Sequence, residues 1–345
     1  MPSVPPDDVS PSLDSVPIID VSALVAGDAH GDASETAAAV GRACRERGFF
    51  YVVGHGVGDE VQTRLEGMAR AFFELPEEVK LRIRMALGGR AWRGYFPVGD
   101  ELTSGRPDAK EGLYFGQELD DTDARVRAGL PLHGPNLFPA EVPGLGETVL
   151  EYMRAMTELG HALMRGVALS LGLEPAHFRD RYMADPLVLF RIFHYPPVPA
   201  RTTDDPQWGV GEHTDYGVLT ILKQDDVGGL QVKSGAGWID APPIPGSFVC
   251  NIGDMLDRLT RGLYRSTPHR VLNTSGRGRL SFPFFFDPGF EARVEPVDLG
   301  AAITPEEDRA LRWDGASVHD FEGTYGDYVL AKVSKVFPEL GERAL

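Results

Sequence analysis

The sequence predicts a mainly β protein, an antiparallel jelly roll with flanking helices and a helical N-terminal cap. Helical periodicity dominates the chain before about residue 171, whereas β-branched and aromatic runs separated by turn residues dominate it from residue 186 onward. Short strands at this spacing are typical of a sandwich or barrel, and a jelly roll protects its sheet edges. The 345 residues, 42% of them hydrophobic, are enough to bury a full core.

The N-terminal cap is expected to span residues 16–150, after a disordered tail at 1–15 that is rich in Pro, Ser and Asp. Residues 92–143 are punctuated by Gly, Pro and Asp, so we expect loop-rich surface with one short strand near 112–116. The other expected elements are order from 16–20, helices at about 34–47, 58–74 and 147–171, a helix starting at 75, and a buried strand at 48–54.

The second part, residues 151–345, is expected to form the jelly-roll core with C-terminal helices over 305–338. These helices should pack outside the barrel or over its mouth. The expected strands are 186–196, 218–224, 229–233, 246–253, 269–273 and 279–286.

The amino-acid composition limits the kinds of partner and the cellular location that we expect for the protein. The chain has 34 Lys plus Arg against 51 Asp plus Glu, a formal charge of −17 with no basic stripe, so nucleic acid is not an expected partner. No run of eighteen or more apolar residues and no secretory leader pattern occurs, which predicts a cytoplasmic protein without a membrane span. Cys44 and Cys250 lie in apolar, periodic segments and are expected to be free, buried thiols.

A metal site is predicted from three residues that precede or begin strands. His213 and Asp215 are two apart, so in extended chain both side chains project to one face, and His269 at the head of a later strand can supply a third ligand. Two imidazoles and one carboxylate leave coordination positions open, as Fe(II) oxygenases require. His30 and Asp32 repeat the spacing in a Gly/Asp/Ala-rich loop, where no strand orders them, and we interpret that copy as coincidental.

Arg279 and Ser281 form a second pair on one strand face. A guanidinium beside a hydroxyl suits a buried carboxylate, which Arg binds with two parallel hydrogen bonds. The alternative is an ordinary surface charge at the start of a strand, and the predicted metal site upstream favours the first interpretation.

These motifs resemble the isopenicillin N synthase-like family of Fe(II)/2-oxoglutarate oxygenases. The resemblance implies a double-stranded β-helix core, His213, Asp215 and His269 as iron ligands, and Arg279 with Ser281 as the anchor for the far carboxylate of 2-oxoglutarate. It also implies consumption of dioxygen and 2-oxoglutarate, release of succinate and CO2, and oxidation of a small-molecule substrate. The runs that carry the likeness along nearly the whole chain are VPIID, GFFYVVGHGV, HYPP, GEHTDYGVLTILKQDDVGGLQV, NIGDMLDRLT, STPHRV, RLSFPFFFDP and TYGDYVLAK.

Details of the co-substrate and substrate sites are expected to differ from the wider family. Many plant relatives carry Asn where this chain has Phe193, so Tyr195 is left as the candidate hydroxyl donor to 2-oxoglutarate. The segment 94–111 resembles bacterial ethylene-forming enzymes in part. Tyr95, Tyr114 and Phe193 are the predicted substrate-side residues, in a region that should flank the barrel mouth.

Two alternatives remain from the sequence. An oxidase of the isopenicillin N synthase type shares the Arg-x-Ser pair but does not use 2-oxoglutarate. A non-catalytic jelly-roll binding protein is the other, although such a protein has no use for open coordination positions. The substrate, its regiochemistry and the oligomeric state are not specified by these patterns.

Overall fold

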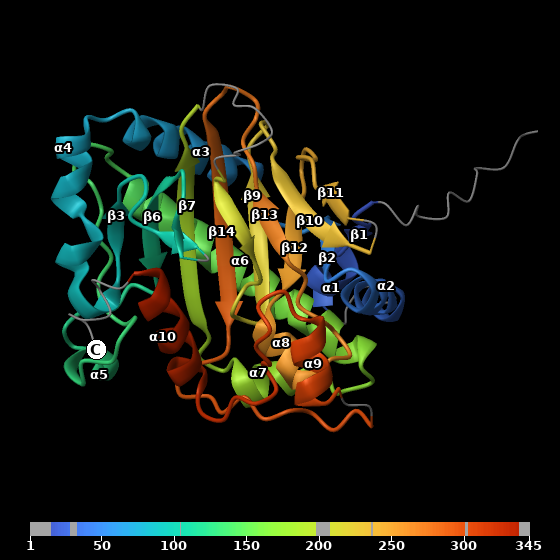
Figure 1. The fold of residues 1–345 in the computed structure, drawn as a ribbon. Helices are drawn as coiled ribbons and strands as arrows, with labels where there is room; N and C mark the ends of the chain where they lie inside the picture. The colour runs from blue at the N-terminus through green and yellow to red at the C-terminus, as the bar shows by residue number, and fades with distance from the viewer. Residues whose placement is uncertain are drawn as a thin grey trace, which may run out of the picture.

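The computed structural model describes residues 15–27, 33–103, 105–197, 208–235, 237–300 and 303–337. In these ranges two β-sheets pack face to face, with helices behind the larger sheet and at one end of the pair (Figure 1). This arrangement confirms the predicted class, a jelly roll with flanking helices. Most of the predicted tail at 1–15 and the His30-Gly31-Asp32 tripeptide lie outside the described residues.

The main sheet has eight strands in the described chain, and all neighbours are antiparallel except β1 and β2. It contains strands from both sides of position 150, so the proposed boundary between cap and core stays a prediction. In spatial order the strands are β1 (Ile18–Asp20), β2 (Phe49–Val53), β12 (Phe248–Ile252), β9 (Leu219–Gln224), β14 (Arg279–Asp287), β7 (Leu187–Tyr195), β6 (Glu111–Gly116) and β3 (Gly94–Phe96).

The smaller sheet is fully antiparallel and has four strands among the described residues. Its register places His269 of one strand directly opposite His213 of its neighbour. In spatial order the strands are β11 (Gly237–Asp240), β10 (Leu230–Ser234), β13 (His269–Val271) and β8 (Val210–His213), and a separate hairpin pairs β4 (Leu102–Thr103) with β5 (Arg106–Pro107).

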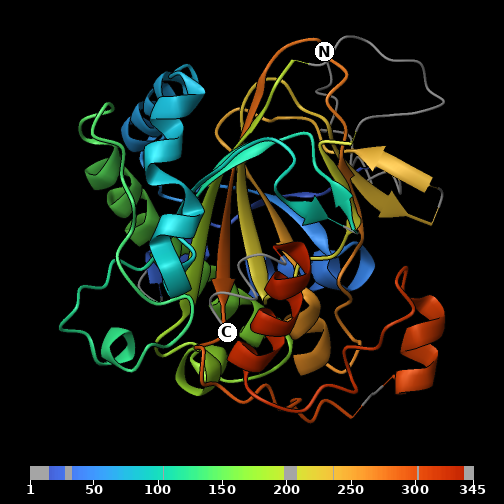
Figure 2. The same cartoon turned by 60° about the vertical axis from the view of Figure 1, so that its left-hand side comes forward.

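The long helix α6 (Leu145–Ser170) crosses behind the main sheet, whereas α10 (Tyr325–Val336) lies in front of it (Figures 1 and 2). The close approach of α6 depends on Gly160, because a Cβ there would come within 2.7 Å of the Phe286 ring. The remaining helices are α1 (Ser22–Ala26), α2 (Ala33–Glu46), α3 (Asp59–Phe73), α4 (Glu77–Lys80), α5 (Ala124–Arg127), α7 (His177–Tyr182), α8 (Asp254–Leu259) and α9 (Pro305–Leu311), with 3₁₀ turns η2 (Leu81–Ile83) and η3 (Met85–Ala91).

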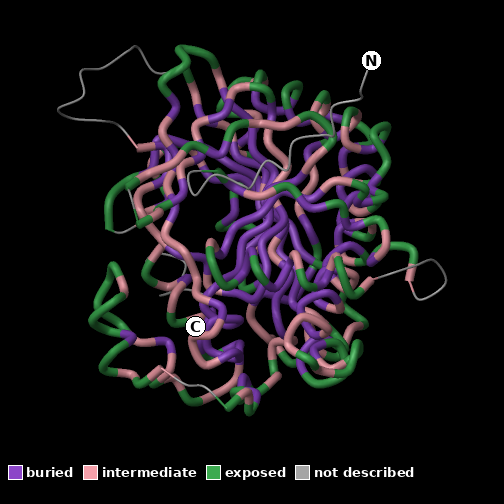
Figure 3. Tube along the Cα trace, turned by 90° about the vertical axis from the view of Figure 1, so that its right-hand side faces the viewer, coloured by how far each residue is buried: buried purple, intermediate pink, exposed green. Residues whose placement is uncertain are grey.

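Buried residues concentrate in the strands at the centre of the molecule (Figure 3). The predicted helices and strands with clear periodicity are present with ends shifted by a few residues, and α2 ends before Gly48, whose φ of 66° is unfavourable for other residues. Cys44 and Cys250 are free and buried, as predicted. Their thiol pKa values are raised by burial, to about 12 for Cys44.

The prediction for residues 92–143 was wrong in part. The segment adds β3 to the main sheet and the β4–β5 hairpin, and Arg93, Glu101 and Lys110 in it are buried. Strands of two or three residues carry too little alternation to be recognised. Strand β3 forms because β6 supplies a backbone partner, and β4 and β5 pair with each other. Strands β8 and β11, of four residues each, were also too short to be recognised, and they form by pairing with β13 and β10.

Candidate active site

A pocket opens between the two sheets and is covered by the C-terminal helix. The main sheet contributes its inner face along β14, where alternate residues from Arg279 to Asp287 line the pocket. His213 and His269 line it from the smaller sheet, and Glu101 and Lys110 reach it from the segment before β6. From α10 and its end come Tyr325, Val329, Val333, Val336 and Phe337. The positions of Glu101, Lys110 and α10 agree with the prediction that the region around Tyr95 and Tyr114 and the C-terminal helices flank the barrel mouth.

The three predicted metal ligands converge at one point of this pocket. Candidate ligand atoms of His213, Asp215 and His269 all lie within 4.8 Å of one another. Asp215 Oδ1 is 3.8 Å from His213 Nε2 and 3.7 Å from His269 Nε2. The extended-strand argument was wrong in one detail, because β8 ends at His213 and Asp215 lies in the following turn.

Each candidate ligand is oriented by a partner that leaves the converging atom free. The Nδ1 atoms of His213 and His269 lie 2.8 Å and 3.3 Å from the carbonyl oxygens of Gly211 and Thr267. A proton on Nδ1 leaves Nε2 with its lone pair, as metal coordination needs.

The carboxylate of Asp215 is held in the same way. Its Oδ2 accepts hydrogen bonds from the Thr220 hydroxyl at 2.5 Å and the Asn251 amide at 2.7 Å, so Oδ1 faces the two imidazoles. The donor set and its outer partners fit a divalent transition metal with positions left for other ligands.

The protonation states also suit metal binding. Burial lowers the pKa of both imidazoles, to about 4 for His269, so both rings are neutral at neutral pH. Burial opposes ionisation of Asp215, but its pKa lies below the ordinary value, and the hydrogen bonds that the carboxylate accepts from Asn251 and Thr220 contribute to this. The site therefore presents two neutral imidazoles and one carboxylate.

Arg279 is the first residue of β14 and is fully buried. Its Nη2 donates to Gln224 Oε1 at 3.3 Å, and its guanidinium carbon lies 4.8 Å from the centre of the Tyr195 ring. Nε and Nη1 are buried without a hydrogen-bond partner in the described part of the chain. A buried guanidinium with two unpaired donors is costly unless an acceptor binds there, so this end fits a carboxylate.

The other predicted pocket residues are divided by the register of the main sheet. Ser281 is paired with Phe193, and both line the pocket. Tyr114, on the next strand beside Arg191, is not among the pocket-lining residues, and its hydroxyl donates to Glu101 Oε1 at 2.7 Å. Tyr95 does not line the pocket: its hydroxyl donates to Glu111 at 2.6 Å and its ring packs on Phe72, so the structure gives no support to a substrate contact by Tyr95.

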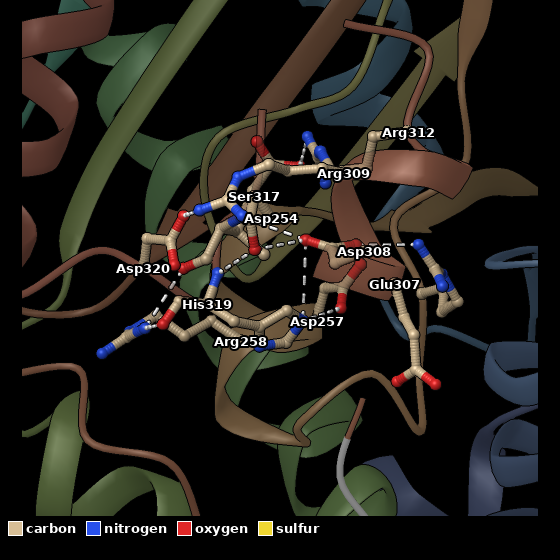
Figure 4. A network of polar contacts seen from close by, with 12 residues as sticks. Asp254, Asp257, Arg258, Glu307, Asp308, Arg309, Arg312, Ser317, His319 and Asp320 are labelled. Atoms are coloured by element: carbon tan, nitrogen blue, oxygen red, sulfur yellow. Dashed lines mark hydrogen bonds and ion pairs between the residues drawn. The ribbon is translucent and has the colours of Figure 1, made fainter. Parts of the chain in front are cut away.

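A network of polar contacts joins residues of α8, among them Asp254 and Asp257, to the C-terminal segment around Asp308 and Arg312 (Figure 4). Asp254, fully buried, donates its backbone N–H to the Asp215 carbonyl at 2.8 Å and accepts from Arg312 at 3.0 Å and from the Tyr328 hydroxyl at 2.8 Å. Arg312 also donates to the Thr214 hydroxyl at 3.2 Å. Asp254 and Arg312 thus connect the segment that carries Thr214 and Asp215 with Tyr328 of α10, the helix that covers the pocket.

Several site residues were missed from the sequence. Thr220, Asn251 and Gln224 orient predicted site residues, and Glu101, Lys110 and Arg191 supply buried charge to the pocket. Asn251 interrupts an apolar strand, and a polar residue in such a run is the signal that could have identified it. Arg191 interrupts the apolar run of β7 and gives the same signal, whereas Glu101, Lys110 and Gln224 do not stand inside such a run.

Two histidines and one carboxylate beside a buried, unpaired arginine inside a jelly roll define the class of non-haem Fe(II) oxygenases. Comparison with known families agrees. Residues 16–141 match the N-terminal region described as non-haem dioxygenase in morphine synthesis, and residues 186–288 match the 2OG-Fe(II) oxygenase superfamily.

Individual relatives agree over almost the full chain. A Dictyostelium discoideum protein named a probable iron/ascorbate oxidoreductase is 49% identical over 97% of this chain and 98% of its own. An Arabidopsis thaliana homoarginine-6-hydroxylase is 38% identical over 95% of this chain and 91% of its own. The crystal structure of a full-length Neurospora crassa protein in complex with alpha-KG and thymine superposes with a TM-score of 0.76 at 29% identity, covering 92% of this chain and 96% of that one.

The chain belongs to the 2OG-Fe(II) oxygenase superfamily, in the isopenicillin N synthase-like family. It is an oxidoreductase, a dioxygenase that uses Fe(II), 2-oxoglutarate and O2 to oxidise a small molecule, with release of succinate and CO2. The predicted family, enzyme class and cofactors are confirmed. In the described ranges, no helix is both long enough and apolar enough to cross a membrane.

Proposed function

We propose that His213, Asp215 and His269 bind the iron of this oxygenase through Nε2, Oδ1 and Nε2. The observation that carries the assignment is the convergence of these three atoms, each on a side chain whose other polar atom is already engaged. When bound, iron and 2-oxoglutarate supply an oxidative decarboxylation that is coupled to oxidation of the substrate. The protein orients the ligands and keeps both imidazoles neutral.

We further propose that Arg279 binds the far carboxylate of 2-oxoglutarate, with Ser281 as a second donor. The unpaired Nε and Nη1 of Arg279 support this, as does the position of Ser281 two residues along the same inner face. Gln224 and the Tyr195 ring hold the guanidinium in place. The Tyr195 ring lies against the Arg279 guanidinium, and donation by its hydroxyl to the co-substrate stays a prediction.

The test is the dependence of turnover on added 2-oxoglutarate. The purified protein with Fe(II) should release succinate and CO2 in proportion to substrate oxidised, and should be inactive without 2-oxoglutarate. An oxidase that only shares the Arg-x-Ser pair would turn over equally well without it. A binding protein would bind compounds without releasing succinate in either condition.

The substrate is proposed to contact Phe193, which lines the pocket beside Ser281, with Tyr114 acting through its neighbours. Homoarginine and related amino acids are the first compounds to assay, because one relative is named a homoarginine-6-hydroxylase. Succinate release over such a panel would identify the compounds that couple. The cytoplasm remains the predicted compartment, testable by fractionation of cells that express the protein.

A further inference from the structure

Arg191, Glu101, Lys110 and Asp287 are charged residues that line the pocket and are not used by the assignments above. Asp287 is occupied, because its carboxylate accepts from the Tyr325 hydroxyl at 2.6 Å and the Val218 N–H at 3.1 Å. Arg191, Glu101 and Lys110 form one cluster. Some of the hydrogen-bond donors and acceptors in this cluster have partners, and others have none.

One oxygen of Glu101 accepts a hydrogen bond, whereas the other is in an ion pair and, in the described part of the chain, has no contact with hydrogen-bond geometry. Oε1 accepts from the Tyr114 hydroxyl at 2.7 Å, and Oε2 lies 2.7 Å from the Lys110 ammonium, which also pairs with Asp108. Arg191 Nη1 reaches the same Oε1 only at 3.5 Å. Glu101 is therefore bound chiefly by Lys110 and Tyr114, and its contact with Arg191 is long for a charge-assisted hydrogen bond.

Arg191 is held firmly while its donors are not satisfied. The guanidinium carbon lies 4.2 Å from the centre of the Tyr114 ring and 4.8 Å from that of Phe285, which restricts its position. Its Nε is buried and has no hydrogen-bond partner in the described part of the chain. Arg279, assigned above to a carboxylate, has the same combination of a fixed guanidinium and a buried, unpaired Nε.

The register places Arg191 between the two assigned sites. Arg191 lies on β7 midway between Leu189 and Phe193. In the register of β7 with β14, Phe193 is paired with Ser281 and Leu189 is paired with Phe285. Phe285 in turn faces Thr220, the residue that binds Asp215. An acceptor bound to Arg191 would therefore lie beside the path from the Arg279 end to the metal, under α10.

We propose that Arg191 is a second carboxylate-binding residue of the pocket and that it binds the carboxylate of the oxidised substrate. The assignment rests on the proposed function, in which Arg279 already binds the far end of 2-oxoglutarate. The substrate is then a small molecule with a free carboxylate, and Tyr114 and Phe285, whose rings lie against the guanidinium, are positioning residues that hold Arg191. The near carboxylate of 2-oxoglutarate is the competing source of the same chemistry.

The test compares acids with their carboxamides on the Fe(II)- and 2-oxoglutarate-loaded protein. Homoarginine, arginine and norleucine, each beside its carboxamide, are assayed for binding by calorimetry and for stimulation of succinate release. Removing the carboxylate charge should weaken the preferred compound roughly 10- to 100-fold in the wild-type protein, the range for one charge-assisted contact. Arg191→Met should abolish that preference and Arg191→Lys should restore part of it.

Control measurements distinguish a role of Arg191 in substrate binding from nonspecific effects of the substitution and from a failure of the proposed iron and 2-oxoglutarate sites. Arg82→Met removes an arginine whose side chain is 66% exposed and should leave the preference unchanged. Iron content and 2-oxoglutarate affinity of Arg191→Met should match the wild type within about threefold, a range well below the effect expected for a charge-assisted contact. Wild-type protein that fails to bind 2-oxoglutarate would instead refute the proposed function.

Three outcomes would overturn the substrate assignment. One is that no acid in the panel is preferred over its carboxamide by the wild-type protein. Another is that the preference persists in Arg191→Met. The third is a loss of 2-oxoglutarate affinity in Arg191→Met as large as that caused by Arg279→Leu. That result would mean that Arg191 binds the near carboxylate of 2-oxoglutarate and not a carboxylate of the substrate.

Discussion

The metal end and the arginine end of the pocket are built in different ways. At the metal end, Gly211, Thr267, Thr220 and Asn251 hold the outer atoms of the three proposed ligands, so the converging atoms are aligned by the protein itself. At the arginine end, Arg279 has one hydrogen bond of 3.3 Å and two buried donors with no partner in the described chain. The metal end is therefore preorganised through protein contacts, whereas the arginine end is completed by its ligand.

The largest expected effect is at the metal end. His213→Ala, Asp215→Ala or His269→Ala should each abolish turnover, because removing one of three ligands leaves too few donors to retain Fe(II). Iron content and succinate release measure this directly. His30→Ala and Asp32→Ala are the controls and should be fully active. A fully active His269→Ala protein with normal iron content would contradict the assignment.

At the arginine end the expected loss is confined to the co-substrate. Arg279→Leu removes two charge-assisted hydrogen bonds, each contributing about 1.5–3 kcal/mol, so 2-oxoglutarate affinity should fall by roughly two to four orders of magnitude. Arg279→Lys keeps the charge without the planar fork and should be intermediate, and Ser281→Ala should be milder. Calorimetric titration with 2-oxoglutarate measures the series. Iron content should be normal throughout, and its loss would mean that the two ends are not independent.

A smaller effect tests whether the outer contacts of the metal end matter. Asn251→Ala removes one of the two hydrogen bonds to Asp215 Oδ2 and should weaken Fe(II) binding about 10- to 100-fold, the usual cost of losing such a partner. Competition with a chelator gives the affinity. Gln224→Ala, which removes the partner of Arg279, is the matched variant and should change 2-oxoglutarate affinity but not iron affinity. Equal effects of both variants on iron would contradict the proposed division.

The smallest expected effect is a pH dependence of stability from Asp287. Burial raises the pKa of its carboxyl to about 7, against partial compensation by the Tyr325 hydrogen bond. The folded state then holds a proton that the unfolded state releases near pH 4. Between those pH values the free energy of unfolding should therefore fall as pH rises, by up to about 1.4 kcal/mol per unit.

Asp287→Asn removes the ionisable group, because the amide has the size of the protonated carboxyl; its oxygen can accept from the Val218 N–H, and its NH2 can donate to the Tyr325 oxygen. Urea unfolding of the iron-free proteins at pH 5 and pH 8 should show a weaker loss of stability with pH in the variant than in the wild type. Asp226→Asn, a surface change at the Arg277 ion pair, should preserve the wild-type pH dependence. Identical pH profiles for wild type and Asp287→Asn would show that the carboxyl ionises freely.

The sequence by itself determined the class of fold, the long helices and the pairs of residues that carry the chemistry. Period-3.6 patterns predicted α2, α3 and α6, and apolar β-branched runs predicted β7, β9, β12 and β14, because in these segments local pattern and tertiary burial agree. His213 with Asp215, and Arg279 with Ser281, line the same pocket in the folded protein, because the two residues of each pair are only two positions apart in the chain.

Only the tertiary structure decided which distant side chains complete these pairs. Short strands such as β3 and β8 exist because a neighbouring backbone pairs with them, and no window of their own sequence contains that partner. Asn251 reaches Asp215 through the register of β12 and β9, and Arg191 meets Tyr114 and Phe285 through pairings of β7 on both sides. Such contacts are set by strand order in space, which local sequence does not encode because residue patterns report burial and period but not neighbours.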